Sequence, residues 1–115
     1  MINYNWDCRK VDAYVEQGGN ANVVHNVNWR LTGSKNNPNT DLLYSITNIG
    51  TQSLDISEIT NFIPWNEVTQ ADVEAWTKEA MGEEQVLAVK ENIAAKIRLL
   101  ETPVSVTLIV GMQIR

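Results

Sequence analysis

The side chains of this chain best suited to catalysis are one imidazole and one thiol, at His25 and Cys8. A hydrolytic triad needs a nucleophile, a base and an orienting carboxylate. His25, however, lies between Val23 and Val27 in a run that alternates apolar and polar residues, and Cys8 alternates in the same way with Trp6. We therefore predict that both are packed or hydrogen-bonded structural residues of strands, and that the chain is not an enzyme.

Metal and cofactor motifs are weak in this sequence. A zinc site needs four ligands at suitable spacing, which one cysteine and one histidine do not supply without carboxylates. Gly18 and Gly19 have neither the lysine of a phosphate-binding loop nor a helix after them, so they indicate a turn. We expect no metal site and no cofactor.

Carboxylates gather around the expected break between two helices, at Glu79, Glu83 and Glu84, and Asp55 and Glu58 lie in the preceding loop. Such a group could form a cation site or an acid/base pair. Each of these residues also has a local reason to be solvated, because it lies near a helix end or in a loop. We favour the solvated interpretation.

Partner contacts are the remaining role for these residues. Trp65 follows Pro64 and is either a loop anchor or an exposed contact, whereas the other tryptophans lie on stripes expected to pack. The possible partner-contact residues are Trp65, Glu83 and Glu84.

Size and charge exclude several classes of protein. A chain of 115 residues with 43% hydrophobic and 20% charged residues is typical of a single domain, here residues 1–115. A net charge of -5 and nine scattered lysines and arginines disfavour nucleic-acid binding. The apolar runs are too short to span a membrane, and the N-terminus lacks signal-peptide features. With one cysteine and no internal disulfide, we expect a location in a cytoplasm or in a particle assembled in a cytoplasm.

Strand patterns occupy the first half. From 21 to 31 the odd positions are mostly apolar, which indicates a strand with one buried face. Apolar residues hold even positions over 2–8 but odd positions over 11–15, so we predict a β-bulge near residues 9–10. The glycines at 18 and 19 predict a hairpin turn between the two strands.

The alternating residues Leu42, Tyr44 and Ile46 predict the start of a third strand, and Gly50 is expected to interrupt it. A short fourth strand over 54–59 is the next expectation. A last strand is the strongest of all, because every even position from Val104 to Ile114 is apolar.

Helical patterns fill the region between these strands. Thr69 and Asp72 form an approximate capping box, Val68 and Val73 have the spacing of a hydrophobic staple, and Gly82 predicts a break. Thr102-Pro103 ends the second helix. The expected apolar stripes are Val73, Trp76 and Ala80 in the first helix and Val86, Val89, Ile93, Ile97 and Leu100 in the second.

Together these elements predict an α+β fold: an antiparallel sheet of four to five strands, a two-helix hairpin packed on one face, and a final strand that returns to the sheet. Open sheet edges invite pairing with another chain, so a homo-oligomer is expected.

Three segments carry a resemblance to a known family: Val27-Asn28-Trp29-Arg30-Leu31-Thr32, Phe62-Ile63-Pro64-Trp65, and the stretch from Trp76 through Ala80-Met81-Gly82-Glu83-Glu84-Gln85-Val86. With Pro103 before a terminal strand, the chain resembles a family of small uncharacterised proteins encoded by tailed bacteriophages. The chain departs from that family in its longer Asn-rich loop over 36–39 and in its Met-Gln-Ile-Arg ending. The resemblance implies a phage origin and carries no catalytic residues over.

Two functions follow as hypotheses. The first is a non-enzymatic phage protein, either a small virion component or an assembly factor, whose partners are further copies of itself or other phage proteins. The alternative is a small acidic phage protein that binds a host protein through its negative surface.

Overall fold

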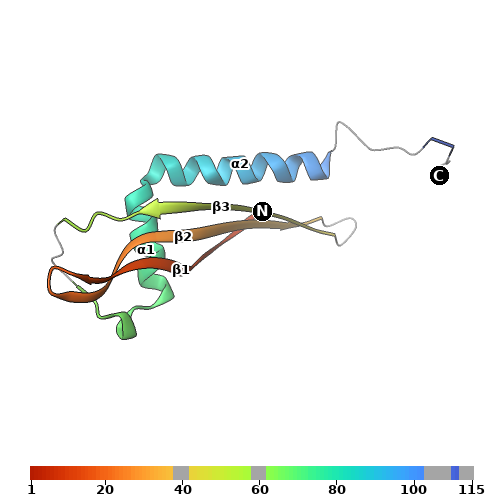
Figure 1. The fold of residues 1–115 in the computed structure, drawn as a ribbon. Helices are drawn as coiled ribbons and strands as arrows, with labels where there is room; N and C mark the ends of the chain where they lie inside the picture. The colour runs from red at the N-terminus through yellow and green to blue at the C-terminus, as the bar shows by residue number, and fades with distance from the viewer. Residues whose placement is uncertain (38–41, 58–61, 103–109, 112–115) are drawn as a thin grey trace.

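The computed structural model describes residues 1–37, 42–57, 62–102 and 110–111. Over these residues the protein is α+β, with an antiparallel three-stranded sheet and two α-helices. The strands lie in the order β1-β2-β3, so β2 is central and the other two form the edges (Figure 1). The elements are β1 (Asn3–Gln17), β2 (Asn20–Asn36), β3 (Leu43–Ser53), the 3-10 turn η1 (Trp65–Glu67), α1 (Gln70–Met81) and α2 (Glu83–Glu101).

The β1–β2 hairpin closes at the two glycines, as predicted. Gly18 and Gly19 have positive φ values of 59° and 86°, and Gln17 pairs with Asn20 across them. Two positive φ values in a two-residue turn match the twist of the flanking strands, and glycine adopts them without a steric penalty. This turn therefore sets the register in which the hairpin closes.

The bulge predicted near residues 9–10 is present in β1. Asp7 pairs with Arg30 but Lys10 pairs with Asn28, so β1 carries one extra residue between them. A second shift toward the turn places the extra residue at His25, in β2. Because the insertions lie on opposite strands, they cancel, and the pairing returns to the register set by the turn.

The second bulge corrects one expectation. Odd positions from 21 to 31 do not all share one face, because the extra residue at His25 changes the parity of β2. Val24 consequently packs against the core, while Val23 is buried outside the main core cluster.

β3 pairs with β2 from Leu43 to Ser53 without a register shift, and its side chains alternate between exposed and half-buried. Gly50 lies inside this strand, opposite Trp29, and does not interrupt it as the sequence suggested. A Cβ at Gly50 would lie 2.6 Å from Trp29 Cζ2, so the glycine makes room for the indole ring. Its role is packing rather than strand termination.

The expected fourth strand is absent from the described part of its range, residues 54–57. Leu54 still donates its N–H to His25 O (2.9 Å), but the Asp55 carboxylate then accepts from the Ser57 N–H and hydroxyl. Such a local side-chain turn satisfies the backbone without a sheet partner. The other strand expected after β3, over 104–114, lies outside the described residues except at 110–111.

The predicted start of α1 is confirmed. Thr69 Oγ1 accepts from the Asp72 N–H (3.2 Å), and Asp72 Oδ2 accepts from the Thr69 N–H (2.9 Å), which completes a capping box.

Gly82 breaks the helix as predicted and adopts a φ of 84°. It is the C-cap of α1 and also the N-cap of α2, so one residue connects the two helices. An antiparallel helical hairpin needs a loop of about two to five residues. The helices therefore form a corner, α1 running across the direction of α2, instead of the expected hairpin (Figure 1).

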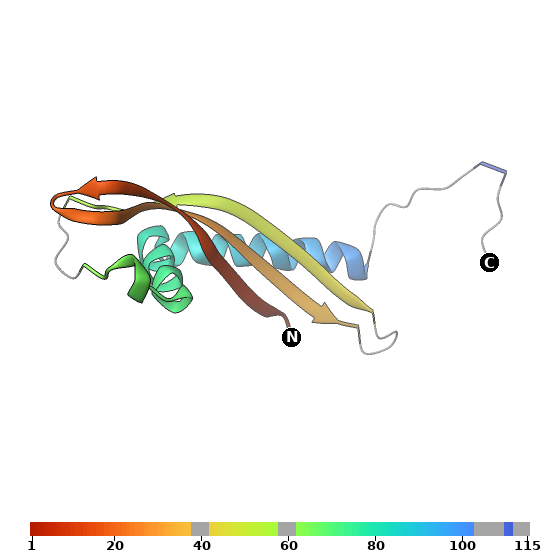
Figure 2. The ribbon, with the colours of Figure 1, turned by 60° about the horizontal axis from the view of Figure 1, so that its bottom comes forward.

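The core lies between one face of the sheet and both helices (Figure 2). In α1 the buried residues are Val73, Thr77 and Met81, whereas Ala80, expected on the stripe, is exposed. The buried residues of α1 follow one another every four positions, and Ala80 does not lie on that line, because the helix covers the sheet at an angle. In α2 the stripe is centred on Ile93 and Ile97, both fully buried. The buried cluster is Trp6, Cys8, Val27, Trp29, Leu31, Val73, Met81, Ile93 and Ile97.

Candidate functional site

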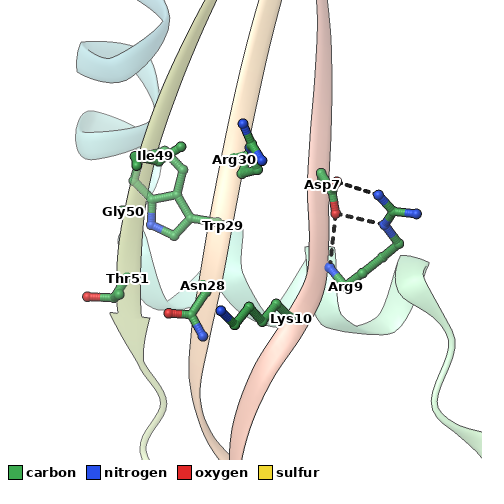
Figure 3. A pocket seen from close by; sticks show the side chains of 9 residues that line it. All are labelled: Asp7, Arg9, Lys10, Asn28, Trp29, Arg30, Ile49, Gly50 and Thr51. Carbon is green, nitrogen blue, oxygen red and sulfur yellow. Dashed lines mark hydrogen bonds and ion pairs between the residues drawn. The ribbon is translucent and has the colours of Figure 1, made fainter.

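The face of the sheet away from the helices carries a shallow hollow of about 740 Å³ (Figure 3). Asp7 and Arg30 face each other across β1 and β2, and Ile49 of β3, 71% exposed, pairs with Arg30 on the other side. The hollow is broad and open, which suits contact with another surface better than enclosure of a small molecule. Its lining residues are Asp7, Arg9, Lys10, Asn28, Trp29, Arg30, Ile49, Gly50 and Thr51.

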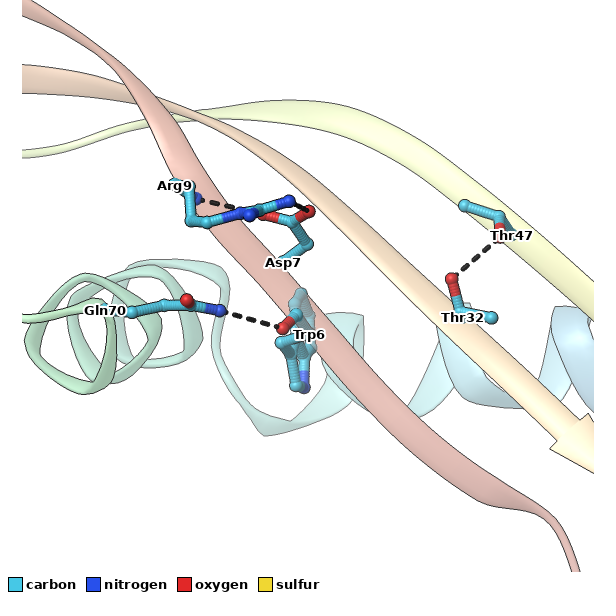
Figure 4. Close-up of polar contacts among 6 residues, drawn as sticks. All are labelled: Trp6, Asp7, Arg9, Thr32, Thr47 and Gln70. Atoms are coloured by element: carbon cyan, nitrogen blue, oxygen red, sulfur yellow. Dashed lines mark hydrogen bonds and ion pairs between the residues drawn. The ribbon is translucent and has the colours of Figure 1, made fainter.

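The bulge in β1 is held by Asp7. Its carboxylate accepts from the Arg9 backbone N–H (3.2 Å) and from Arg9 Nε (3.0 Å) and Nη2 (2.9 Å) (Figure 4). These hydrogen bonds from Arg9 lower the pKa of the Asp7 carboxyl below its ordinary value of 3.8. Arg9 is therefore engaged by its neighbour and is not a free cation in the hollow.

Two backbone hydrogen bonds at the ends of β3 show which of its residues bond to β2 and which face the free edge. Leu54 N donates to His25 O (2.9 Å), and Asn37 N donates to Leu42 O (2.8 Å). Hydrogen-bonded residues alternate along an antiparallel strand, and the β2–β3 register has no shift between these ends. Even-numbered residues of β3 therefore bond to β2, while odd-numbered residues direct their N–H and C=O groups outward.

These outward backbone groups have no strand beside them in the described part of the chain. At the far end Ser53 O accepts from Gln52 Nε2 (2.9 Å). β3 contains no charged residue, no proline and no bulge, the features that usually protect an edge strand. The outward-directed residues are Leu43, Ser45, Thr47, Ile49 and Thr51.

The opposite edge, β1, is protected by a bulge, by charged residues and by a covering helix. It contains a bulge and five charged residues. The α1 helix also lies beside it: Gln70 Nε2 donates to Trp6 O (3.5 Å, Figure 4), and Lys78 Nζ lies 5.9 Å from the centre of the Trp6 ring. Of the two described edges, β3 is consequently the one open to another strand.

Sequence reasoning expected open edges but did not identify which one. The signal was present as the thirteen-residue stretch from Leu42 to Leu54, which has no charged residue in a chain that is 20% charged.

The model of one protein family, described as a domain of unknown function (DUF7936), matches residues 1–109. The chain belongs to this family. No curated protein and no solved structure matches it. The family match extends through the sheet, both helices and most of the alternating segment that follows them.

Cys8 and His25 are not brought together in this DUF7936 fold. Cys8 is fully buried in the core, where burial raises the pKa of its thiol. His25 occupies the bulge of β2, and its ring stacks on that of Tyr14 with 4.1 Å between centroids. Each has the packed or hydrogen-bonded position predicted for a strand residue.

The residues predicted as partner contacts lie apart. Trp65 is in η1 and is 45% exposed, while Glu83 and Glu84 are exposed in the first turn of α2. The twelve residues of α1 separate them by roughly 18 Å. They do not form one surface around a single partner group, and their role as contacts stays a prediction.

The other carboxylates lie separately too. Glu79 is exposed on α1, Asp55 accepts from Ser57, and these hydrogen bonds lower the pKa of Asp55. Glu58 lies outside the described residues. Within the described ranges, no three His, Cys, Asp or Glu side chains are grouped to hold a metal, and neither helix is long and apolar enough to cross a membrane.

Proposed function

We propose that this protein is a non-enzymatic phage protein, a small virion component or an assembly factor, that works by associating with further copies of itself. The open β3 edge carries this proposal: a regular, uncharged strand with a row of outward N–H and C=O groups is a template for pairing. The resemblance of the chain to small phage proteins supplies the setting, in the host cytoplasm or in the virion.

The finer architecture belongs to the same proposal. The alternating segment 104–114 supplies a fourth strand to a sheet, which brings the strand number to four, the lower bound of the four to five that the sequence predicts. A strand that alternates in this way is stable only when one face is buried.

Mass spectrometry of purified particles from the phage that encodes the chain tests this function. We expect many copies per particle for a virion component, or enrichment in assembly intermediates for an assembly factor. Absence from both would overturn the proposal.

A second function, binding of a basic host protein, is favoured by one observation. Glu83 and Glu84 are exposed side by side at the corner between the helices, in a chain of net charge -5. A host protein bound by wild type should lose affinity for Glu83→Gln/Glu84→Gln but not for Glu79→Gln, which removes an exposed charge from α1. Equal binding by both variants would exclude this surface.

A further inference from the structure

The C-terminal segment contains a strand pattern without a place in the described sheet. From Val104 to Val110 every even position is apolar, and no charged residue occurs from 102 to 114. Val110 is described and is fully exposed, at 101% of its reference area. Together with Gly111 it lies beyond the end of α2 and away from the sheet of its own chain (Figure 1). An alternating apolar segment in this position needs a partner to cover it.

The β3 edge is a matching acceptor. It is 11 residues long, as is the segment from 104 to 114, and its outward backbone groups lack a strand in the described chain. Exposed apolar side chains lie close to it. Ile49 is 71% exposed on β3, and Leu99 is 55% exposed on α2.

Leu99 lies on the side of α2 that faces β3. Asn48 of β3 donates to Asn92 of α2 (3.1 Å), and Leu99 follows Asn92 by seven residues, so both lie on one stripe of the helix. An added strand beside β3 would therefore meet an apolar side chain from the helix layer as well as the backbone of the edge.

We infer that the β3 edge of one copy receives residues 104–114 of a second copy as an added strand. This inference rests on the proposed self-association and names the two surfaces that produce it. Every copy carries one donor segment and one acceptor edge, so two copies can exchange segments and close a symmetric pair. Neither surface is charged, so the net charge of -5 is not concentrated where the copies meet.

The attachment of α2 supports exchange between copies. Glu101, the last residue of α2, forms an ion pair with Lys35 of β2 (3.0 Å), which fixes the point where the chain leaves the helix layer. The short described segment 110–111 lies beyond the end of α2 and not beside β3 (Figure 1). The segment of a second copy is thus the occupant that the arrangement favours.

The experiment uses two full-length variants, each of which removes one surface. Ile49→Pro deletes an outward N–H from β3 and leaves the β2 ladder intact, because residue 49 does not bond to β2. Leu108→Lys places a charge on the apolar face of the donor segment. The matched controls are Ile49→Thr, which keeps the N–H, and Thr107→Lys, which places the same charge on the alternate face.

Light scattering at micromolar concentration gives the mass of each sample. Wild type and both controls should have twice the 12.9 kDa monomer mass or a higher multiple. Each test variant should need at least roughly tenfold more protein to associate. For Ile49→Pro this is the factor expected when one net backbone hydrogen bond is lost at each of the two junctions, and for Leu108→Lys the cost is that of burying a charge against an apolar surface. Circular dichroism confirms that each variant is folded.

Mixing the two test variants gives the decisive result. Ile49→Pro still has its donor segment and Leu108→Lys still has its acceptor edge, so a 1:1 mixture should form a heterodimer through one intact junction. Neither variant alone has an intact junction, so the mixture should associate at lower concentration than either variant, though more weakly than wild type. The inference is overturned if the mixture stays monomeric. It is also overturned if Leu108→Lys alone associates like wild type, a result that would favour direct pairing of two β3 edges. A monomeric wild type overturns it as well. The two variant results leave the self-association of wild type intact, so they overturn the inference alone. A monomeric wild type also overturns the self-association in the proposed function, while the phage role itself is tested separately by the particle measurement.

Discussion

Replacing Gly33 with alanine tests how closely α2 approaches the sheet. Gly33 is buried in β2 under α2, and a Cβ built there overlaps Ile93 Cγ2. The same Cβ would lie 3.2 Å from Ile2 Cγ2 and 3.2 Å from Tyr4 Cε1. Ile93 is fully buried and belongs to the core cluster, so it has little free space into which to move.

The magnitude follows from overpacking. Inserting one methyl group into a packed core costs about 1–3 kcal/mol, and we expect the upper half of that range because three neighbours are too close. Ile93→Ala alone should cost about 2–5 kcal/mol through the cavity that it leaves. In the double variant the new methyl group fills part of that cavity, so the combined loss should be smaller than the sum by at least about 0.5 kcal/mol.

Urea unfolding followed by tryptophan fluorescence measures these changes, since Trp6 and Trp29 are both in the core. Ser45→Ala, on the exposed face of β3, is the control and should change the free energy of unfolding by less than about 0.5 kcal/mol. Strict additivity of Gly33→Ala and Ile93→Ala would refute the proposed contact. A neutral Gly33→Ala would show that α2 does not lie this close to β2.

Three further predictions concern local features. Thr69→Ala should lower the free energy of unfolding by about 1 kcal/mol, because it removes the acceptor of the N-cap hydrogen bond; thermal denaturation measures this, and an unchanged midpoint would contradict it. Gly82→Val should cost at least that much, because φ 84° with ψ 156° is a backbone conformation that essentially only glycine adopts; Gly82→Ala should be destabilising for the same reason, and an unchanged midpoint for both variants would contradict it. The lowered pKa of Asp7 implies a stability contribution that is present above its unfolded pKa and lost as pH falls through the folded pKa, so Asp7→Asn should flatten the stability profile below about pH 4. Because the Arg9 pair is exposed, that effect should stay under about 1 kcal/mol, and an identical acid profile in both proteins would show that the bond does not form.

Features that depend on near neighbours were predictable from the sequence. The capping box at Thr69, the break at Gly82 and the glycine turn at residues 18–19 each involve groups within a few residues of one another. The bulge near residue 9 was visible because it changes the parity of a long alternating run. In each case the energetic reason is local, so the residues themselves carry it.

Features that depend on distant packing were not predictable in the same way. In the sequence Gly50 indicates a strand break, but in the structure it accommodates the ring of Trp29 on the neighbouring strand. Thr77 has a polar side chain, yet it is fully buried and donates to Val73 O (2.8 Å). The angle between the helices depends on the backbone geometry of a one-residue connection. The apolar stripes show which residues are buried but do not specify that geometry.

The sequence by itself determined the α+β character, the hairpin, the two helices and the alternating pattern of the C-terminal segment. Only the tertiary structure decided which sheet edge remains open. That choice depends on the strand order and on the position of α1, whose Gln70 reaches Trp6 O from 64 residues away in sequence. Hydrophobic periodicity specifies which face of a strand is buried, whereas the partner at its edge is set by backbone groups that are the same in every residue.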